Sequence, residues 1–127
     1  MLPAQHRMRR SADFGATVKH GRRAVQPDLV IYDRRTEPTE TSTPDAATPT
    51  PPQVGLIIAK TVGSAVERHR VARRLRHVAR TLLADLQPDE RLVIRALPGS
   101  RDATSATLGA QLRAGLQSIR RTAGTVR

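Results

Sequence analysis

Short runs of consecutive apolar residues alternate along the chain with longer segments in which apolar residues recur every three or four positions. The short runs are rich in Val, Ile and Leu, and their brevity favours strands over helices. They predict strands at residues 29–32, 54–59 and 91–96, and the second is expected to be buried because its apolar run is nearly unbroken. A further short strand near residues 22–25 stays an open alternative.

The spacing of three and four residues predicts three helices, at residues 11–20, at residues 64 to about 86 and at about 105–121. Gly21 follows the first helix, where a glycine commonly ends a helix. The third helix carries its apolar residues in one stripe, which consists of Leu108, Leu112, Leu116 and Ile119.

This order predicts an α+β fold, αβββαβα with the extra strand and αββαβα without it. The 127 residues are enough for one small domain, spanning residues 1–127. One segment differs from the rest: Thr36–Gln53 holds five of the nine prolines and six threonines, with three acids and no Lys or Arg. Such a segment cannot bury a core, so we expect a disordered insert between two strands.

Charge narrows the possible functions. A formal net charge of +11 at pH 7 is typical of a protein that binds a polyanion. The chain has no cysteine, which excludes disulfides and thiol nucleophiles, and its four histidines lack the spacing of metal ligands. No apolar run approaches the ~20 residues of a membrane span, and the first residues do not resemble a signal peptide. We expect a soluble cytoplasmic protein with no metal site of its own.

The central helix separates its apolar and basic residues. Ser64 and Glu67 form a capping-box pattern at its start. One side carries Val71, Leu75, Val78, Leu82 and Leu86, and the opposite side carries His69, Arg73, Arg76 and Arg80, with Arg70 and His77 beside them.

Between Lys60 and Arg80 there are seven Lys or Arg residues and one acid. An ordinary solvated face would interleave acids, because like charges four residues apart destabilise a helix by a few tenths of a kcal/mol per pair. The basic side therefore predicts contact with phosphates, which the planar guanidinium can hold in a forked geometry.

The segment Lys60–Arg76, KTVGSAVERHRVARRLR, resembles the signature of the bacterial ribonuclease P protein family. The match includes Lys60, Gly63, Ala65, Val66, Arg68, Arg70, Arg73, Arg74 and Arg76. Asp13-Phe14, Val18, Gly21, the strand at residues 30–32 and Ile94-Arg95 fit the same family. The resemblance covers nearly the whole chain except the insert. His69 departs from the family, which has Asn there, and Val18 stands where an aromatic is common, so both contacts are expected to differ.

The resemblance implies a two-layer sandwich like the second domain of a ribosomal small-subunit protein, with a left-handed βαβ crossover. It also implies a function: this protein would bind the catalytic RNA subunit, one protein per RNA, and the 5′ leader of precursor tRNA. The RNA subunit would remove the leader with Mg²⁺ ions that the RNA holds, so the isolated chain has no catalytic residue. Residues facing the RNA subunit would be Lys60, Arg68, His69, Arg70, Arg73, Arg74 and Arg76, and Phe14, Val18 and Tyr32 would line the leader cleft. No membrane or small-molecule cofactor is implied.

Three other classes of protein remain as alternatives. A ribosomal or other structural RNA-binding protein would share the charge and the fold class but would need no leader cleft. A helix-based DNA-binding protein would need two helices joined by a tight turn and base-reading Asn or Gln side chains, which the sequence lacks. A protein nuclease would need paired carboxylates or a His–acid pair, and neither pattern is present.

Overall fold

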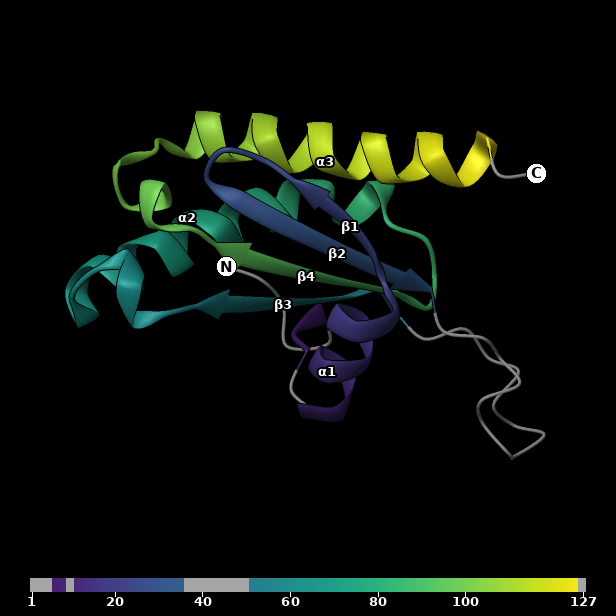
Figure 1. Cartoon of the computed structure of the whole chain (residues 1–127), viewed down its shortest axis with the longest axis horizontal. Helices are drawn as coiled ribbons and strands as arrows, with labels where there is room; N and C mark the ends of the chain where they lie inside the picture. The colour runs from purple at the N-terminus through teal and green to yellow at the C-terminus, as the bar shows by residue number, and fades with distance from the viewer. Residues whose placement is uncertain (1–5, 9–10, 36–50, 126–127) are drawn as a thin grey trace.

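The computed structural model describes residues 6–8, 11–35 and 51–125, and it confirms an α+β fold (Figure 1). The elements follow the order αβββαβα, so the additional strand is present. In chain order they are α1 (Ser11–His20), β1 (Arg22–Val25), β2 (Leu29–Arg35), β3 (Gln53–Ile58), the 3-10 helix η4 (Lys60–Val62), α2 (Ala65–Leu82), the 3-10 helix η5 (Leu83–Asp85), β4 (Glu90–Ala96), the 3-10 helix η6 (Pro98–Asp102) and α3 (Ser105–Thr125).

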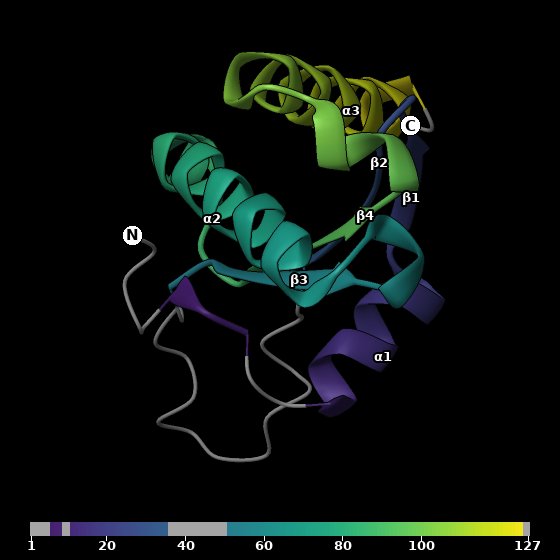
Figure 2. The same ribbon diagram turned by 90° about the vertical axis from the view of Figure 1, so that its left-hand side faces the viewer.

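The four strands form one sheet in the order β1-β2-β4-β3. The pairs β1/β2 and β2/β4 are antiparallel, whereas β3 and β4 are parallel and are joined through α2. Helices α2 and α3 cover one face of the sheet, and α1 lies against the other (Figure 2). The structure therefore has α1 alone on a face that the other helices leave open.

The β3–α2–β4 connection is left-handed. In Figure 1 both strands point to the left, β4 lies above β3, and α2 passes behind the sheet. Figure 2 places α2 on the same rear side. About 98% of such crossovers are right-handed, so the general rule gives the wrong hand and the family resemblance gives the right one.

The main core lies between the sheet and the two helices α2 and α3. Strands β2 and β4 supply alternate residues to it, with Ile31 directly opposite Ile94. The apolar stripes predicted for both helices are confirmed, because all of their residues are buried: Val71, Leu75, Val78, Leu82 and Leu86, and Leu108, Leu112, Leu116 and Ile119.

Several element ends differ from the sequence prediction. Helix α2 ends at Leu82, four residues early, because the chain tightens into η5, where the Leu86 N–H donates to Leu83 O at 3.2 Å. Strand β3 begins at Gln53, one residue before the predicted start. Gln53 pairs with Arg91 and therefore belongs to the sheet, although the prediction placed it in the insert. Ala59 lies just beyond β3, and α3 continues past residue 121 to Thr125. Of the predicted insert, residues 36–50 lie outside the described residues, and Pro51 and Pro52 precede β3 without regular structure.

The first helix ends where predicted. The Gly21 N–H donates to Thr17 O at 2.8 Å, and a Cβ on Gly21 would lie 2.3 Å from that oxygen. Only glycine fits there, which fixes the turn into β1. Among the helices in the described part of the chain, none has both the length and the apolar character needed to cross a membrane.

A carboxyl pair lies on the α3 side of the sheet, with Glu90 buried and Asp33 partly buried. The register of β2 and β4 points Asp33 and Glu90 to the same face, and Glu90 is 3% exposed. Burial raises the pKa of Asp33 to about 8, and a hydrogen bond with Glu90 and the repulsion between the two carboxyls act in the same direction. Arg120 and Arg22 oppose the increase in pKa.

The raised pKa predicts that stability falls as pH rises. Between its unfolded value of 3.8 and about 8, native Asp33 keeps a proton that the unfolded chain has lost. The free energy of unfolding should therefore decrease across that pH window and level off above it. Asp33→Asn mimics the protonated group, so it should flatten this slope and stabilise the protein above pH 8.

Urea unfolding at intervals from pH 5 to pH 9 measures this effect. Asp102→Asn, at a carboxylate whose side chain is 82% exposed, is the matched control and should keep the wild-type slope. If the free energy of unfolding of Asp33→Asn depended on pH as steeply as that of the wild type, the prediction would be contradicted.

Candidate nucleic-acid interface

The start of α2 is fixed by reciprocal hydrogen bonds. Ser64 Oγ accepts from the Glu67 N–H at 3.2 Å, and Glu67 Oε1 accepts from the Ser64 N–H at 2.9 Å, which confirms the predicted capping box. The bonds from Ser64 hold the pKa of Glu67 below its usual value. A Cβ on Gly63 would lie 2.7 Å from Glu67 Oε1, so the glycine leaves room for this cap. The cap sets which α2 residues face the sheet and which face outward.

The outward side of α2 forms a basic hollow of about 600 Å³. Its lining contains no acid among the described residues and consists of Val66, His69, Arg70, Arg73, Arg76 and His77. Within the described ranges, Arg73 and Arg76 make no hydrogen bond or ion pair, so their guanidinium groups are available to a ligand. The hollow thus presents uncompensated positive charge, which suits a polyanion.

Four of the seven residues predicted to face the RNA subunit line this hollow: His69, Arg70, Arg73 and Arg76. The other three lie elsewhere. Lys60 is exposed in η4, and Arg68 is partly buried. Arg74 points away from the hollow, since its Nη1 donates to the carbonyl oxygens of Arg101 at 3.2 Å and Ala103 at 3.1 Å. These bonds hold the segment before α3 against α2, which is a structural role.

A second, smaller hollow of about 170 Å³ lies beside Phe14, where α1 meets the edge strand β3. A Cβ on Gly55 would lie 2.5 Å from Phe14 Cε1, so the ring rests directly over that glycine. The full lining consists of Arg7, Met8, Phe14, Val54, Gly55, Leu56 and Arg76. An aromatic ring bordered by two arginines is a suitable surface for an unstacked base and its phosphate.

The three residues predicted to line a leader cleft differ in exposure. Phe14 is partly buried beside the small hollow, and Val18 is 38% exposed one turn further along α1. Tyr32 is 8% exposed and packs with Met8 and Val93 in a second apolar cluster on the α1 side of the sheet. The structure therefore offers Phe14 to a ligand more readily than Tyr32.

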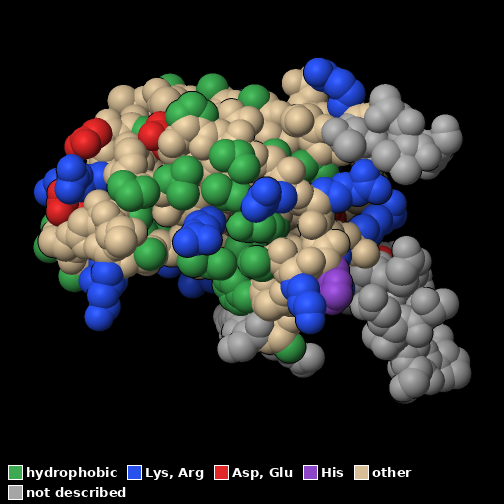
Figure 3. Space-filling view, viewed as in Figure 1, with side chains coloured by type: hydrophobic (Ala, Val, Ile, Leu, Met, Phe, Trp, Pro, Cys, Tyr) green, Lys and Arg blue, Asp and Glu red, His purple; other side chains and the backbone are tan. Residues whose placement is uncertain are grey.

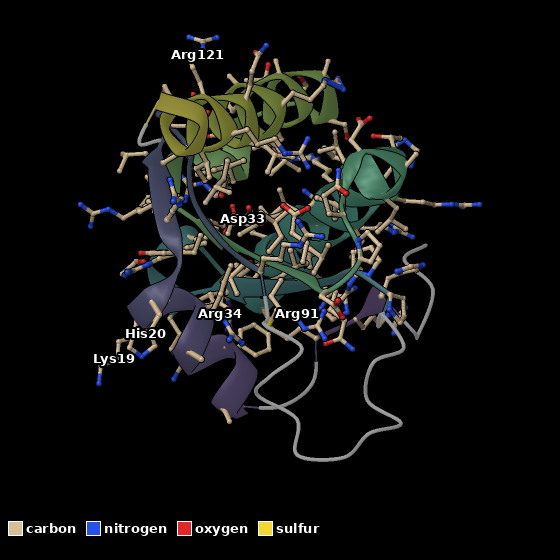
Figure 4. All side chains as sticks on the ribbon, turned by 90° about the vertical axis from the view of Figure 1, so that its right-hand side faces the viewer. Lys19, His20, Asp33, Arg34, Arg91 and Arg121 are labelled. Atoms are coloured by element: carbon tan, nitrogen blue, oxygen red, sulfur yellow. The ribbon has the colours of Figure 1, made fainter. Side chains whose placement is uncertain are left out.

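The sheet face around α1 carries arginines that the sequence analysis missed. The strand register places four of them on the same face as Tyr32: Arg23, Arg34, Arg91 and Arg95. Figure 4 shows Arg34 and Arg91 on the α1 side and Asp33 on the other. In Figure 3 hydrophobic side chains gather in the middle of this face, with Lys and Arg side chains among and around them. The alternating positions of Arg91, Val93 and Arg95 in the sequence could have predicted that these side chains share one face of the strand.

Among the described residues, no three His, Asp or Glu side chains lie close enough together to hold a metal ion. The fold and the two hollows instead define a small α+β protein with an extended basic surface.

Comparison with known proteins identifies the family. The ribonuclease P family model matches residues 2–120 of this chain. The ribonuclease P protein component of Mycobacterium avium is 59% identical over 113 residues, covering 88% of this chain and 89% of that protein. The corresponding protein of Mycolicibacterium vanbaalenii is 55% identical over 124 residues, covering 98% of both chains. The chain therefore belongs to the ribonuclease P protein family, and its role is that of the enzyme's protein subunit in tRNA processing.

Solved structures show the same fold at lower identity. The ribonuclease P protein of Staphylococcus aureus has a TM-score of 0.69 at 20% identity, covering 88% of this chain and 93% of that one. That of Thermotoga maritima has a TM-score of 0.67 at 17% identity, covering 91% and 96%.

The geometry gives Arg73 and Arg74 different roles, which substitution by Ala can separate. Arg73→Ala should make the slope of log K against log[salt], where K is the binding constant for ribonuclease P RNA, less steep. The change should correspond to the loss of about one phosphate contact. Arg74→Ala should keep the wild-type slope and lower the free energy of unfolding by about 1 kcal/mol for each hydrogen bond lost. RNA titrations at several salt concentrations and urea unfolding measure both quantities. A lowered slope in Arg74→Ala would show that this side chain contacts RNA as well.

Proposed function

We propose that this protein binds the catalytic RNA subunit of ribonuclease P through the basic hollow on α2, and the 5′ leader of precursor tRNA beside Phe14. It thereby assists the endonucleolytic removal of the leader, which yields the mature tRNA 5′ end. The observation that carries the proposal is the hollow on α2, which is lined by three arginines and two histidines and contains no acid among its described residues.

The chemistry of the hollow suits a structured RNA. Arginine offers five donors in a planar fork, so adjacent guanidinium groups can grip several phosphates of a folded backbone. Arg70, Arg73 and His77 are exposed on one side of a rigid helix, so binding requires little reordering of the backbone. His69 stands where the family has Asn, and its ring can donate a single hydrogen bond to a phosphate.

The hollow beside Phe14 suits a single strand. Stacking of one base on an aromatic ring contributes about 1–3 kcal/mol and tolerates any base, which fits leaders of variable sequence. Val18 extends the apolar surface along α1, and Tyr32 supports it from the sheet. The arginines of the same sheet face, including Arg23 and Arg95, would contact the leader's phosphates.

Catalysis in this proposal belongs to the RNA subunit and its Mg²⁺ ions. We assign these ions to the RNA, and among the described residues no group of three acidic or histidine side chains comes together. The protein contributes binding and orientation, one copy per RNA, and the isolated chain should not cleave RNA.

Reconstitution at low Mg²⁺ tests the proposal. The protein should raise the rate at which ribonuclease P RNA processes precursor tRNA, because bound arginines replace cations that would otherwise screen the phosphates. RNA alone and protein alone are the controls, and both should be nearly inactive at that Mg²⁺ concentration. An RNA-binding protein of structural function would bind RNA without this stimulation, and that result would refute the proposed function.

Loss of the Phe14 ring should weaken leader binding selectively. Phe14→Leu keeps an apolar side chain over Gly55 but removes the stacking surface, so the holoenzyme's affinity for precursor tRNA should fall by about 1–3 kcal/mol. Affinity for tRNA without a leader should stay unchanged. Equilibrium binding of the two substrates, with unfolding measured in parallel, gives the comparison. An equal loss for both substrates would place Phe14 in the core only.

A further inference from the structure

Arg76 lines both hollows. It borders the basic hollow on α2 together with Arg73 and His77, and it borders the small hollow together with Phe14 and Gly55. The other described residues of the two linings belong to one hollow each. The two candidate binding surfaces are therefore contiguous, and this guanidinium lies at their junction.

The position of β3 explains how a residue of α2 reaches the α1 side. Strand β3 is at the edge of the sheet, with α2 packed on one side of it and α1 on the other (Figure 2). Among the described residues only the short segment at Arg7 and Met8 pairs with β3 at this edge, and it lines the small hollow itself. A side chain on α2 that extends past β3 can thus reach the hollow beside Phe14.

The environment of Arg76 leaves its donors available. The residue is partly buried, and within the described part of the chain no hydrogen bond or ion pair occupies its guanidinium. Arg74, only two residues away, instead donates to two backbone carbonyl oxygens. Since Arg76 carries a charge at a partly buried position without a protein partner, a ligand that supplies an anion there would be favoured.

We propose that Arg76 is a shared phosphate contact, which binds the RNA subunit on the α2 side and the single-stranded leader on the Phe14 side. The planar fork presents donors along two edges, so one guanidinium can serve phosphates that approach from different directions. This inference rests on the proposed function and adds to it the residue that joins the two RNA-binding surfaces.

The proposal predicts a double effect for one substitution. Arg76→Ala should weaken two separate interactions, that of the protein with ribonuclease P RNA and that of the protein with a short single-stranded RNA of about eight nucleotides. Each loss should be roughly three- to tenfold, as expected for one charge-assisted contact at a partly exposed site. The salt dependence of each interaction should fall by about one phosphate contact.

Three variants serve as matched controls. Arg70→Ala removes a charge from the α2 hollow only and should weaken binding to ribonuclease P RNA alone. Phe14→Leu changes the small hollow only and should weaken binding to the short RNA alone. Arg80→Ala removes an exposed charge from the same helix outside both linings, and it should change either affinity less than Arg76→Ala does.

The pattern across the variants separates the two possible failures. If Arg70→Ala and Phe14→Leu behave as expected but Arg76→Ala weakens only one interaction, or has no more effect than Arg80→Ala, the shared contact is refuted. If Arg70→Ala and Phe14→Leu change neither affinity, the proposed function fails as well. Circular dichroism of each variant checks that α2 remains folded.

Discussion

The packing of α2 against the sheet is the interaction on which the binding surface depends. Val71 and Leu75 are fully buried, and burial of each such side chain contributes about 1.5–3 kcal/mol. Repulsion between arginines on the outer side costs only a few tenths of a kcal/mol per pair. Burial therefore outweighs repulsion by about an order of magnitude, and the helix can carry positive charge that no neighbouring acid neutralises.

The second surface depends on how the edge of the sheet is covered. The Met8 N–H donates to Val54 O at 3.0 Å, which pairs the segment before α1 with β3. The next residue of β3, Gly55, has no side chain, and the Phe14 ring fills that space. A larger residue at position 55 would displace the ring, so a glycine in the edge strand β3 positions the aromatic group that a base can approach. This strand is only partly buried and is not the buried strand that its apolar run predicts.

Local patterns in the sequence predicted the features that local interactions determine. The capping box of Ser64 and Glu67 and the apolar stripe of α2 each involve residues within a few turns of one helix, so their spacing was sufficient. The pairing of Asp33 with Glu90 depends on strand register between distant segments, which the spacing does not reveal. Strand β4 was read as one apolar run because Leu92, Val93 and Ile94 hide the alternation of Arg91 and Arg95.

The same limit applies to the basic residues of α2. Arg74 and Arg76 belong to one basic motif, yet two positions correspond to roughly 200° around a helix, so the side chains point in nearly opposite directions. Arg74 faces η6 and binds two carbonyl oxygens there, whereas Arg76 faces the edge of β3. The arginines of the motif thus do not all face the same side of the helix, and Arg74 already donates hydrogen bonds within the protein. The arginine bound to η6 helps instead to hold the segment that leads into α3, whose apolar stripe completes the core behind the sheet.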